Sequence, residues 1–184
     1  MPPRNLGLGK SMCQGTNMTT PVRLNAAGLP IDFESEYARV EQYDDNSCLF
    51  AVLGCIAGCT AQEVRAVAVA NGHIPEHGPY TVVDDGSLAA FLAAHYGWVA
   101  SVWKECTHTY QLPALCILLV EVSEKFSGRH ILFARQRNRG GQPNVEYVVD
   151  CGYWVPPEGH IRAISDHELS WYIALHPMEQ STEY

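Results

Sequence analysis

The spacing of apolar residues changes character about halfway along the chain. Before that point Leu88, Phe91, Leu92 and His95 recur at i, i+3, i+4 and i+7, which is typical of a helix that buries one face. After it, runs such as 115–122 are rich in aliphatic and β-branched residues and are bounded by Gly, Pro and polar residues, as strands are. Helices followed by strands predict an α+β fold, with a cleft where the two parts meet.

Capping signals flank the apolar stretches of the first half. The segment 60–63, Thr-Ala-Gln-Glu, is a capping box, and Asn71 followed by Gly72 is a typical helix end. Three helices are therefore expected: from Cys48 to about Gly58 with Asn46 or Ser47 as cap, from Thr60 to Asn71, and from Asp85-Gly86-Ser87 to Gly97.

The second half contains the expected strands. They are the segments 98–103, 115–122, 130–135 and 145–150, which we expect to form one largely antiparallel sheet. The segment 165–168, Ser-Asp-His-Glu, has the form of another capping box, and it predicts a short last helix that carries Trp171, Tyr172 and Leu175.

Length and composition indicate one domain. The chain has 184 residues, of which 47% are hydrophobic and 17% charged, which is enough apolar material for one core. Residues 1–17 are rich in Gly, Pro and Asn and are expected to be a disordered leader. We expect a single catalytic domain over 18–177 and a polar tail over 178–184.

Charge and cysteine content narrow the class of protein. The net charge is −8 and the basic residues gather only at 135–139, which argues against nucleic-acid binding. There is no apolar run of membrane-spanning length, so no membrane partner is expected. Seven cysteines, an odd number, fit a reducing compartment better than a disulfide framework. We expect a cytoplasmic protein, or one that acts in a host cytosol as a secreted effector or viral protein, and a monomer.

Cys48 is the candidate nucleophile. A cysteine in the first turn of a helix lies near unpaired backbone N–H groups, which favour the thiolate and lower its pKa. The alternative is a buried structural cysteine, which is how we interpret the cysteines in apolar or strand context: Cys55, Cys59, Cys106 and Cys116.

His130 and Asp150 are the candidate base and orienting carboxylate. His130 opens a strand, and Asp150 ends the next one. If the two strands are hairpin neighbours, the two side chains lie at the same end of the sheet. A Cys–His–Asp arrangement supplies a nucleophile, a proton acceptor and a group that fixes the imidazole tautomer. The alternatives are a strand-edge histidine and a turn-forming aspartate.

The chain resembles the papain-like superfamily of cysteine peptidases in the order of Gln42, Cys48, His130 and Asp150. The segment 45–50, Asp-Asn-Ser-Cys-Leu-Phe, is also similar to the signature of ovarian-tumour-type deubiquitinases, and the compact size is similar to viral leader proteases and bacterial papain-like effectors. The resemblance implies a papain-like fold, in which the nucleophile helix packs on a mostly antiparallel sheet.

The resemblance also implies an activity. Cys48 would attack a carbonyl carbon, His130 would transfer the proton, Asp150 would orient His130, and Gln42 would help to bind the oxyanion. The expected function is a thiol hydrolase that cuts a peptide or isopeptide bond in a protein substrate, with ubiquitin or a ubiquitin-like protein as one candidate and with no cofactor. A papain-like deamidase or acyltransferase, and a non-catalytic protein-binding module, are the alternatives.

Two further features bear on metal binding and on the substrate cleft. Cys55 and Cys59, followed by His73 and His77, have nearly the spacing of a two-Cys, two-His zinc site, but Pro75 interrupts the histidine pair, so core cysteines and a solvated loop are preferred and no metal is expected. Asn46, Tyr153 and Trp154 are candidate residues of the substrate cleft, with the two aromatic side chains expected to wall the His130 side.

Overall fold

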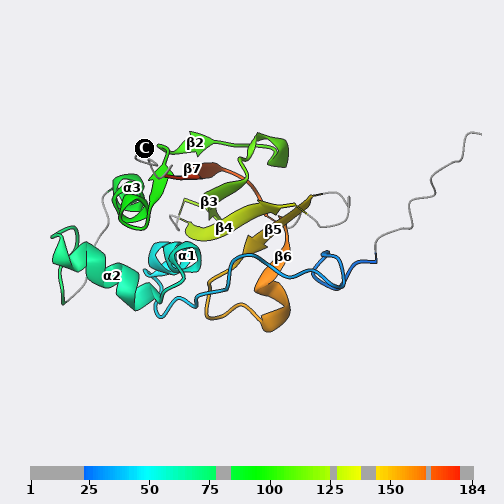
Figure 1. Ribbon diagram of the computed structural model, residues 1–184, viewed down its shortest axis with the longest axis horizontal. Coiled ribbons are helices and arrows are strands. Elements are labelled where there is room, and N and C mark those ends of the chain that lie inside the picture. Colours follow the sequence, from blue (N-terminus) through cyan, green and yellow to red (C-terminus); the bar gives the residue numbers. More distant parts are fainter. Residues whose placement is uncertain (1–22, 78–83, 125–127, 138–143, 165–166, 179–184) are drawn as a thin grey trace, which may run out of the picture.

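The computed structural model describes residues 23–77, 84–124, 128–137, 144–164 and 167–178 (Figure 1). The expected leader at 1–17 lies outside the described residues, as do 179–184 of the expected tail. In the described part of the chain, no single helix is long and apolar enough to cross a membrane.

One antiparallel sheet dominates the fold, with strand order β1-β7-β3-β4-β5-β6 and β2 paired with β7. The α+β prediction is therefore confirmed, and the strands expected at 115–122, 130–135 and 145–150 are present with slightly different ends. The strands are β1 (Trp98–Ala100), β2 (Lys104–Glu105), β3 (Leu115–Val120), β4 (Arg129–Gln136), β5 (Val145–Val149), β6 (Ile161–Ala163) and β7 (Trp171–Pro177).

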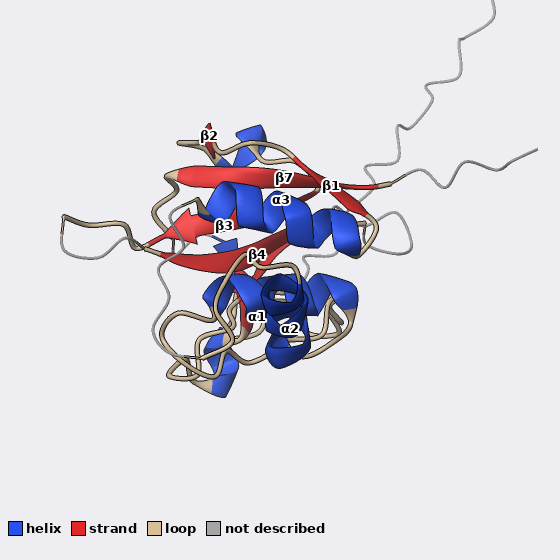
Figure 2. Ribbon diagram, turned by 90° about the vertical axis from the view of Figure 1, so that its left-hand side faces the viewer, coloured by secondary structure: helices blue, strands red, loops and turns tan. Residues whose placement is uncertain are grey.

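Among the described residues, three α-helices lie on one side of this sheet (Figure 2). They are α1 (Cys48–Ala57), α2 (Ala61–Ala70) and α3 (Asp85–His95), with short 3-10 turns at Thr109–Gln111 and Pro157–Gly159. The capping box that opens α2 is present, since Thr60 Oγ1 accepts from the Glu63 N–H and Glu63 Oε2 accepts from the Thr60 N–H. Gly58, in the left-handed region at φ 69°, ends α1 as expected.

Alternation along the strands divides the core into two layers. Leu132 and Val149 face the helices, whereas their neighbours Phe133 and Val148 face a second, smaller cluster on the opposite side. The helix α1 is buried over most of its length, which matches its almost uninterrupted apolar sequence. The sheet therefore has one face covered by helices and one covered by loops and turns.

The predicted last helix is wrong. Residues 171–177 form strand β7, which lies between β1 and β3. Ile173 and Leu175, two residues apart, are both buried against the helices, as alternation along a strand requires. Pairing with β1 and β3 made this segment a strand instead of a helix. Ser165 and Asp166 of the supposed capping box lie outside the described residues. The strand expected at 98–103 is also shorter, since β1 ends at Ala100.

Candidate active site

Cys48 is the first residue of α1 and is in contact with a histidine. Its Sγ lies 3.2 Å from His130 Nδ1, across 82 residues of sequence, and the side chain is 8% exposed. The backbone N–H of Leu49, in the first turn of the helix, helps to lower the pKa of this thiol. The sequence prediction that brings Cys48 and His130 together is confirmed.

His130 reaches Cys48 because it occupies the helix-facing side of β4. The alternation that turns Leu132 toward the helices also turns His130 there, at the end of the strand nearest the start of α1. The ring is 7% exposed. Its other nitrogen, Nε2, lies 3.1 Å from Asp85 Oδ2, so the imidazole is held at both ends.

Asp85 is a site residue that the sequence reasoning missed. It is the first residue of α3, where a carboxylate is favoured by the helix dipole. The helix begins there because Asp84 Oδ1 accepts a hydrogen bond of 3.0 Å from the Ser87 N–H. In the sequence, Asp85 indicates only the start of a helix, and its position before His130 in the chain does not point to a role in the site.

Trp103 completes the surroundings of His130. Its Nε1 donates a hydrogen bond of 3.0 Å to Asp85 Oδ1, and its ring stacks on the imidazole at a centroid distance of 5.8 Å and an interplanar angle of 28°. Gly86 permits this approach, because a Cβ atom there would lie 3.0 Å from Trp103 Cδ1. The sequence places Trp103 only at the end of the strand expected over 98–103, so its role beside His130 was missed.

The three ionisable groups shift one another toward an ion pair. Burial alone would raise the pKa of Cys48, but the hydrogen bond and the charge of His130 outweigh it and the pKa is lowered. Burial would likewise lower the pKa of His130, yet hydrogen bonds and charges from Asp85 and Cys48 raise it to about 9. The hydrogen bond from His130 lowers the pKa of Asp85, against the effect of burial. A thiolate beside an imidazolium is the favoured state.

The predicted His130–Asp150 pair is wrong. Asp150 is fully buried, and its Oδ1 accepts a hydrogen bond of 2.6 Å from Arg129 Nη1. The reason is strand alternation. Leu132 pairs with Val149, so Asp150 comes opposite Ile131, which belongs to the face that looks away from the helices. The two strands are hairpin neighbours as expected. Asp150 comes one residue after Val149, however, so its carboxylate lies on the opposite face of the sheet from His130.

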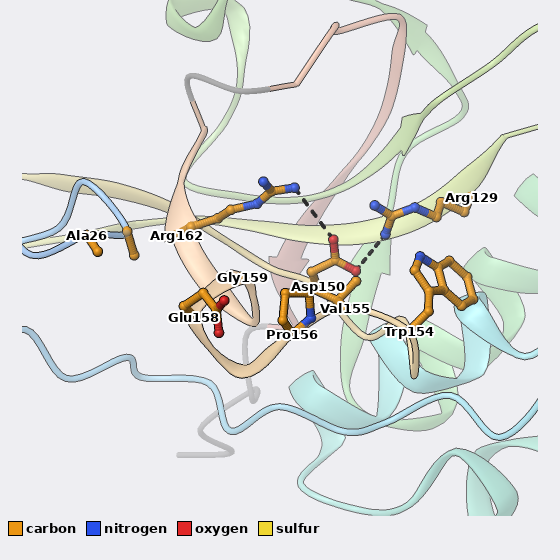
Figure 3. Close-up of a pocket in the computed structure, with 10 residues that line it drawn as sticks. Ala26, Arg129, Asp150, Trp154, Val155, Pro156, Glu158, Gly159 and Arg162 are labelled. Atoms are coloured by element: carbon orange, nitrogen blue, oxygen red, sulfur yellow. Dashed lines mark hydrogen bonds and ion pairs between the residues drawn. The ribbon is translucent and has the colours of Figure 1, made fainter.

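Asp150 and Arg129 line a separate pocket of about 370 Å³, shown in Figure 3. The Arg129 guanidinium also binds Glu121 through two hydrogen bonds of 2.8 Å. The Trp154 ring lies over Arg129 at 5.7 Å and is 48% exposed. Trp154 therefore covers this ion pair, whereas the aromatic wall of His130 is Trp103.

The loop before Cys48 is tied down by several buried polar groups. Ser47, which has no exposed surface, accepts hydrogen bonds through Oγ from the N–H groups of Tyr43 and Asp44 instead of capping α1. Gln42 is 1% exposed, and its Nε2 donates a hydrogen bond of 2.9 Å to the Asp44 carbonyl. The position supports a role of Gln42 in holding the loop, and its role at an oxyanion stays a prediction.

Two of the candidate cleft residues lie at this loop. The Tyr153 hydroxyl donates a hydrogen bond of 2.7 Å to Asp45 Oδ1, and its ring is 51% exposed. Asn46 is exposed, with its N–H bonded to Asp44 Oδ1. Both residues therefore lie at the surface near Cys48. Asn46 is two residues before it in the chain, and Tyr153 is bonded to Asp45 of the same loop.

The alternative zinc site is not assembled. Cys55 contacts Cys151 at 3.6 Å between the sulfur atoms, and the His73 ring packs on Phe91 at 4.2 Å. Among the described residues, no group of three or more His, Cys, Asp or Glu side chains is arranged to hold a metal ion.

A comparison with protein-family models and with curated protein sequences found no match for this chain.

Proposed function

We propose that this chain is a cysteine-dependent hydrolase that cleaves a peptide or isopeptide bond. The observation that carries the proposal is the continuous contact from Cys48 Sγ to His130 and from His130 to Asp85, at 3.2 and 3.1 Å. A nucleophile, a base and a group that orients the base are the three parts that an acyl transfer to cysteine requires.

Each residue has a distinct chemical task. The Cys48 thiolate attacks the substrate carbonyl carbon, and the imidazolium of His130 then protonates the departing amine. The resulting thioester is hydrolysed when neutral His130 removes a proton from water. Asp85 keeps Nδ1 of His130 directed at the sulfur throughout and favours the protonated ring.

The start of α1 supplies the electrostatics for the oxyanion. The backbone N–H of Cys48 lies at the positive end of the helix dipole, and one such donor contributes about 2.7–4 kcal/mol in other acyl-transfer enzymes. We keep Gln42 as the second donor in the proposal, with Asn46 as the other candidate. Gln42 has two N–H protons, and the hydrogen bond to the Asp44 carbonyl uses one of them.

A papain-like fold is part of the proposal. An apolar helix that begins at the nucleophile and packs on an antiparallel sheet, with the histidine on a sheet strand, supports it. The orienting carboxylate differs from the expected order, because Asp85 precedes His130 in the chain. The cytosol stays the proposed working place, supported by the free thiols of the six described cysteines.

Ubiquitin and ubiquitin-like proteins are the first substrates to try. Deamidation or acyl transfer would use the same Cys48 chemistry, with a different leaving group or a different acyl acceptor. The test is release of a fluorescent amine from the C-terminus of ubiquitin and from a mixed peptide library, by the full chain and by Cys48→Ala. Turnover of either substrate that Cys48→Ala abolishes supports hydrolysis. Loss of ammonia from glutamine substrates without chain cleavage would favour the deamidase, and binding without turnover would favour a binding module.

A further inference from the structure

Two cysteine side chains meet where α1 packs on the turn that follows β5. Cys55 Sγ lies 3.6 Å from Cys151 Sγ, although 96 residues separate them in the chain. The side chains are 5% and 0% exposed, and both thiols are free. Neither thiol belongs to the contacts among Cys48, His130 and Asp85, so the pair is a separate chemical feature of the fold.

The environment makes the two thiols unequal. The hydrogen bond from Cys151 lowers the pKa of Cys55, and the Val40 N–H, 3.2 Å from Cys55 Sγ, and the charge of Arg39 act in the same direction against burial. The same hydrogen bond, together with burial, raises the pKa of Cys151 well above its usual value. Cys55 is thus the sulfur suited to act as a nucleophile, and Cys151 is the partner that keeps its proton.

We propose that Cys55 and Cys151 form a reversible modification site, which a small peroxide converts to a disulfide. The Cys55 sulfur attacks one oxygen of hydrogen peroxide, the O–O bond breaks, and a sulfenic acid and hydroxide form. The hydroxide takes up the proton that the Cys55 thiol has given up and becomes water. The Cys151 sulfur then attacks the Cys55 sulfur, the S–O bond breaks and water leaves. In total, two thiols and one hydrogen peroxide give one disulfide and two waters.

The distance already favours the second step. A disulfide needs about 2.05 Å between its sulfur atoms. The two sulfur atoms are already in contact at 3.6 Å, so they need only move closer together. Peroxide suits the site because both thiols are buried, and a molecule little larger than water needs only a small opening to reach them.

The disulfide would act on the segment that leads to Cys48. Residues 39–42 run beside the turn, since Arg39 donates hydrogen bonds to the Asp150 and Gly152 carbonyls and the Gln42 N–H donates one of 2.9 Å to the Cys151 carbonyl. Moving Cys151 toward α1 changes the position of a carbonyl that holds Gln42, and Gln42 in turn holds the loop before Cys48. The modification is thereby coupled to the candidate active site.

The test maps the bond by mass and does not rest on hydrolase activity. The reduced full chain is treated with a small excess of hydrogen peroxide, remaining thiols are alkylated under denaturing conditions, and the protein is digested with trypsin without reduction. Cleavage after arginine places Cys55 in the peptide 40–65 and Cys151 in the peptide 140–162. We expect these two peptides linked and lighter than their sum by two hydrogen atoms. Fragmentation should place the bond at Cys55, and dithiothreitol should reverse it.

Matched variants make the result decisive. Cys59→Ser removes another thiol of the peptide 40–65 and should leave the linked pair intact, whereas Cys55→Ser and Cys151→Ser should abolish it. Oxidation of Cys48 in the wild-type chain serves as the internal sign that peroxide has reacted. Oxidised Cys48 without a 40–65 to 140–162 link, or a link that appears only after unfolding, would overturn the proposal. Either result leaves the proposed hydrolase function untouched.

Discussion

Asp85 Oδ2 lies 3.1 Å from His130 Nε2, which joins the first turn of α3 to the first residues of β4 across 45 positions in the chain. Asp150, by contrast, binds Arg129. If the contact to Asp85 fixes the imidazole, Asp85→Asn should lower kcat by about 10²- to 10⁴-fold, with KM nearly unchanged, because the substrate-contacting groups are intact. Steady-state kinetics on a substrate that the wild-type chain turns over in the ubiquitin and peptide-library test measures this.

Asp150→Asn is the matched control for that variant. Like Asp85→Asn, it replaces a hydrogen-bonded carboxylate by its isosteric amide, but at a fully buried residue on the face of the sheet away from His130. Equal losses of kcat in the two folded variants would contradict the assignment of Asp85 as the orienting group.

The pH dependence of turnover follows from the shifted pKa values. Activity should rise on the acid side as Cys48 loses its proton, below the usual thiol range because its pKa is lowered, and should fall above about 9, where His130 loses its proton. In Asp85→Asn one of the two groups that raise the pKa of His130 is gone, so the alkaline limb should move to lower pH. An alkaline limb that stays in place in this variant would show that Asp85 does not act on His130.

Trp103 should act on catalysis through its N–H group. Trp103→Phe retains an aromatic ring beside His130 but removes the donor to Asp85, which corresponds to about 1 kcal/mol, or roughly fivefold in kcat. Gly86→Ala should give a similar or larger loss, since the new methyl group would lie 3.0 Å from the indole ring. Both variants are compared by kcat and by thermal unfolding. A normal kcat in folded Trp103→Phe would mean that the indole only fills space.

Arg129 and Asp150 should matter for stability. Asp150→Ala leaves a buried guanidinium without one of its two carboxylate partners, and breaking a buried pair typically costs about 3–5 kcal/mol. For a chain of this size that corresponds to a drop in Tm of roughly 6–20 °C. Calorimetry measures the drop, and alkylation of Cys48 in the folded protein should be normal. An unchanged Tm would contradict the stabilising role.

Much of the architecture follows from local signals. The start of α1 at Cys48, the capping box of α2 and the strands around 115–149 were all predicted, because capping residues and buried aliphatic runs are properties of short segments. The last strand was not, since Trp171, Tyr172 and Leu175 satisfy helical spacing, while Ile173 and Leu175 in the same segment satisfy strand alternation. The β1 and β3 neighbours that decide between the two come from distant parts of the chain.

The candidate site was predicted in part for the same reason. Cys48 is marked by its place at a helix start and His130 by its place at the start of a strand. Asp85 and Asp150 are both acidic residues at the end of an element. Which of them contacts His130 depends on the face of the sheet toward which Asp150 points and on where α3 lies over the sheet. Trp103 is outside any long strand, and only the folded chain brings its N–H group to Asp85.

The most direct test of the proposed site is the rate at which Cys48 alone is alkylated by iodoacetamide, measured by peptide mass as a function of pH. The wild-type chain should react at Cys48 at about pH 6 well before the other thiols, and His130→Ala should lose this reactivity and follow an ordinary thiol, with a pKa near 8.5. Cys48 labelling that is slow at about pH 6 and identical in the two proteins would contradict the thiolate–imidazolium pair, and with it the proposed catalytic function.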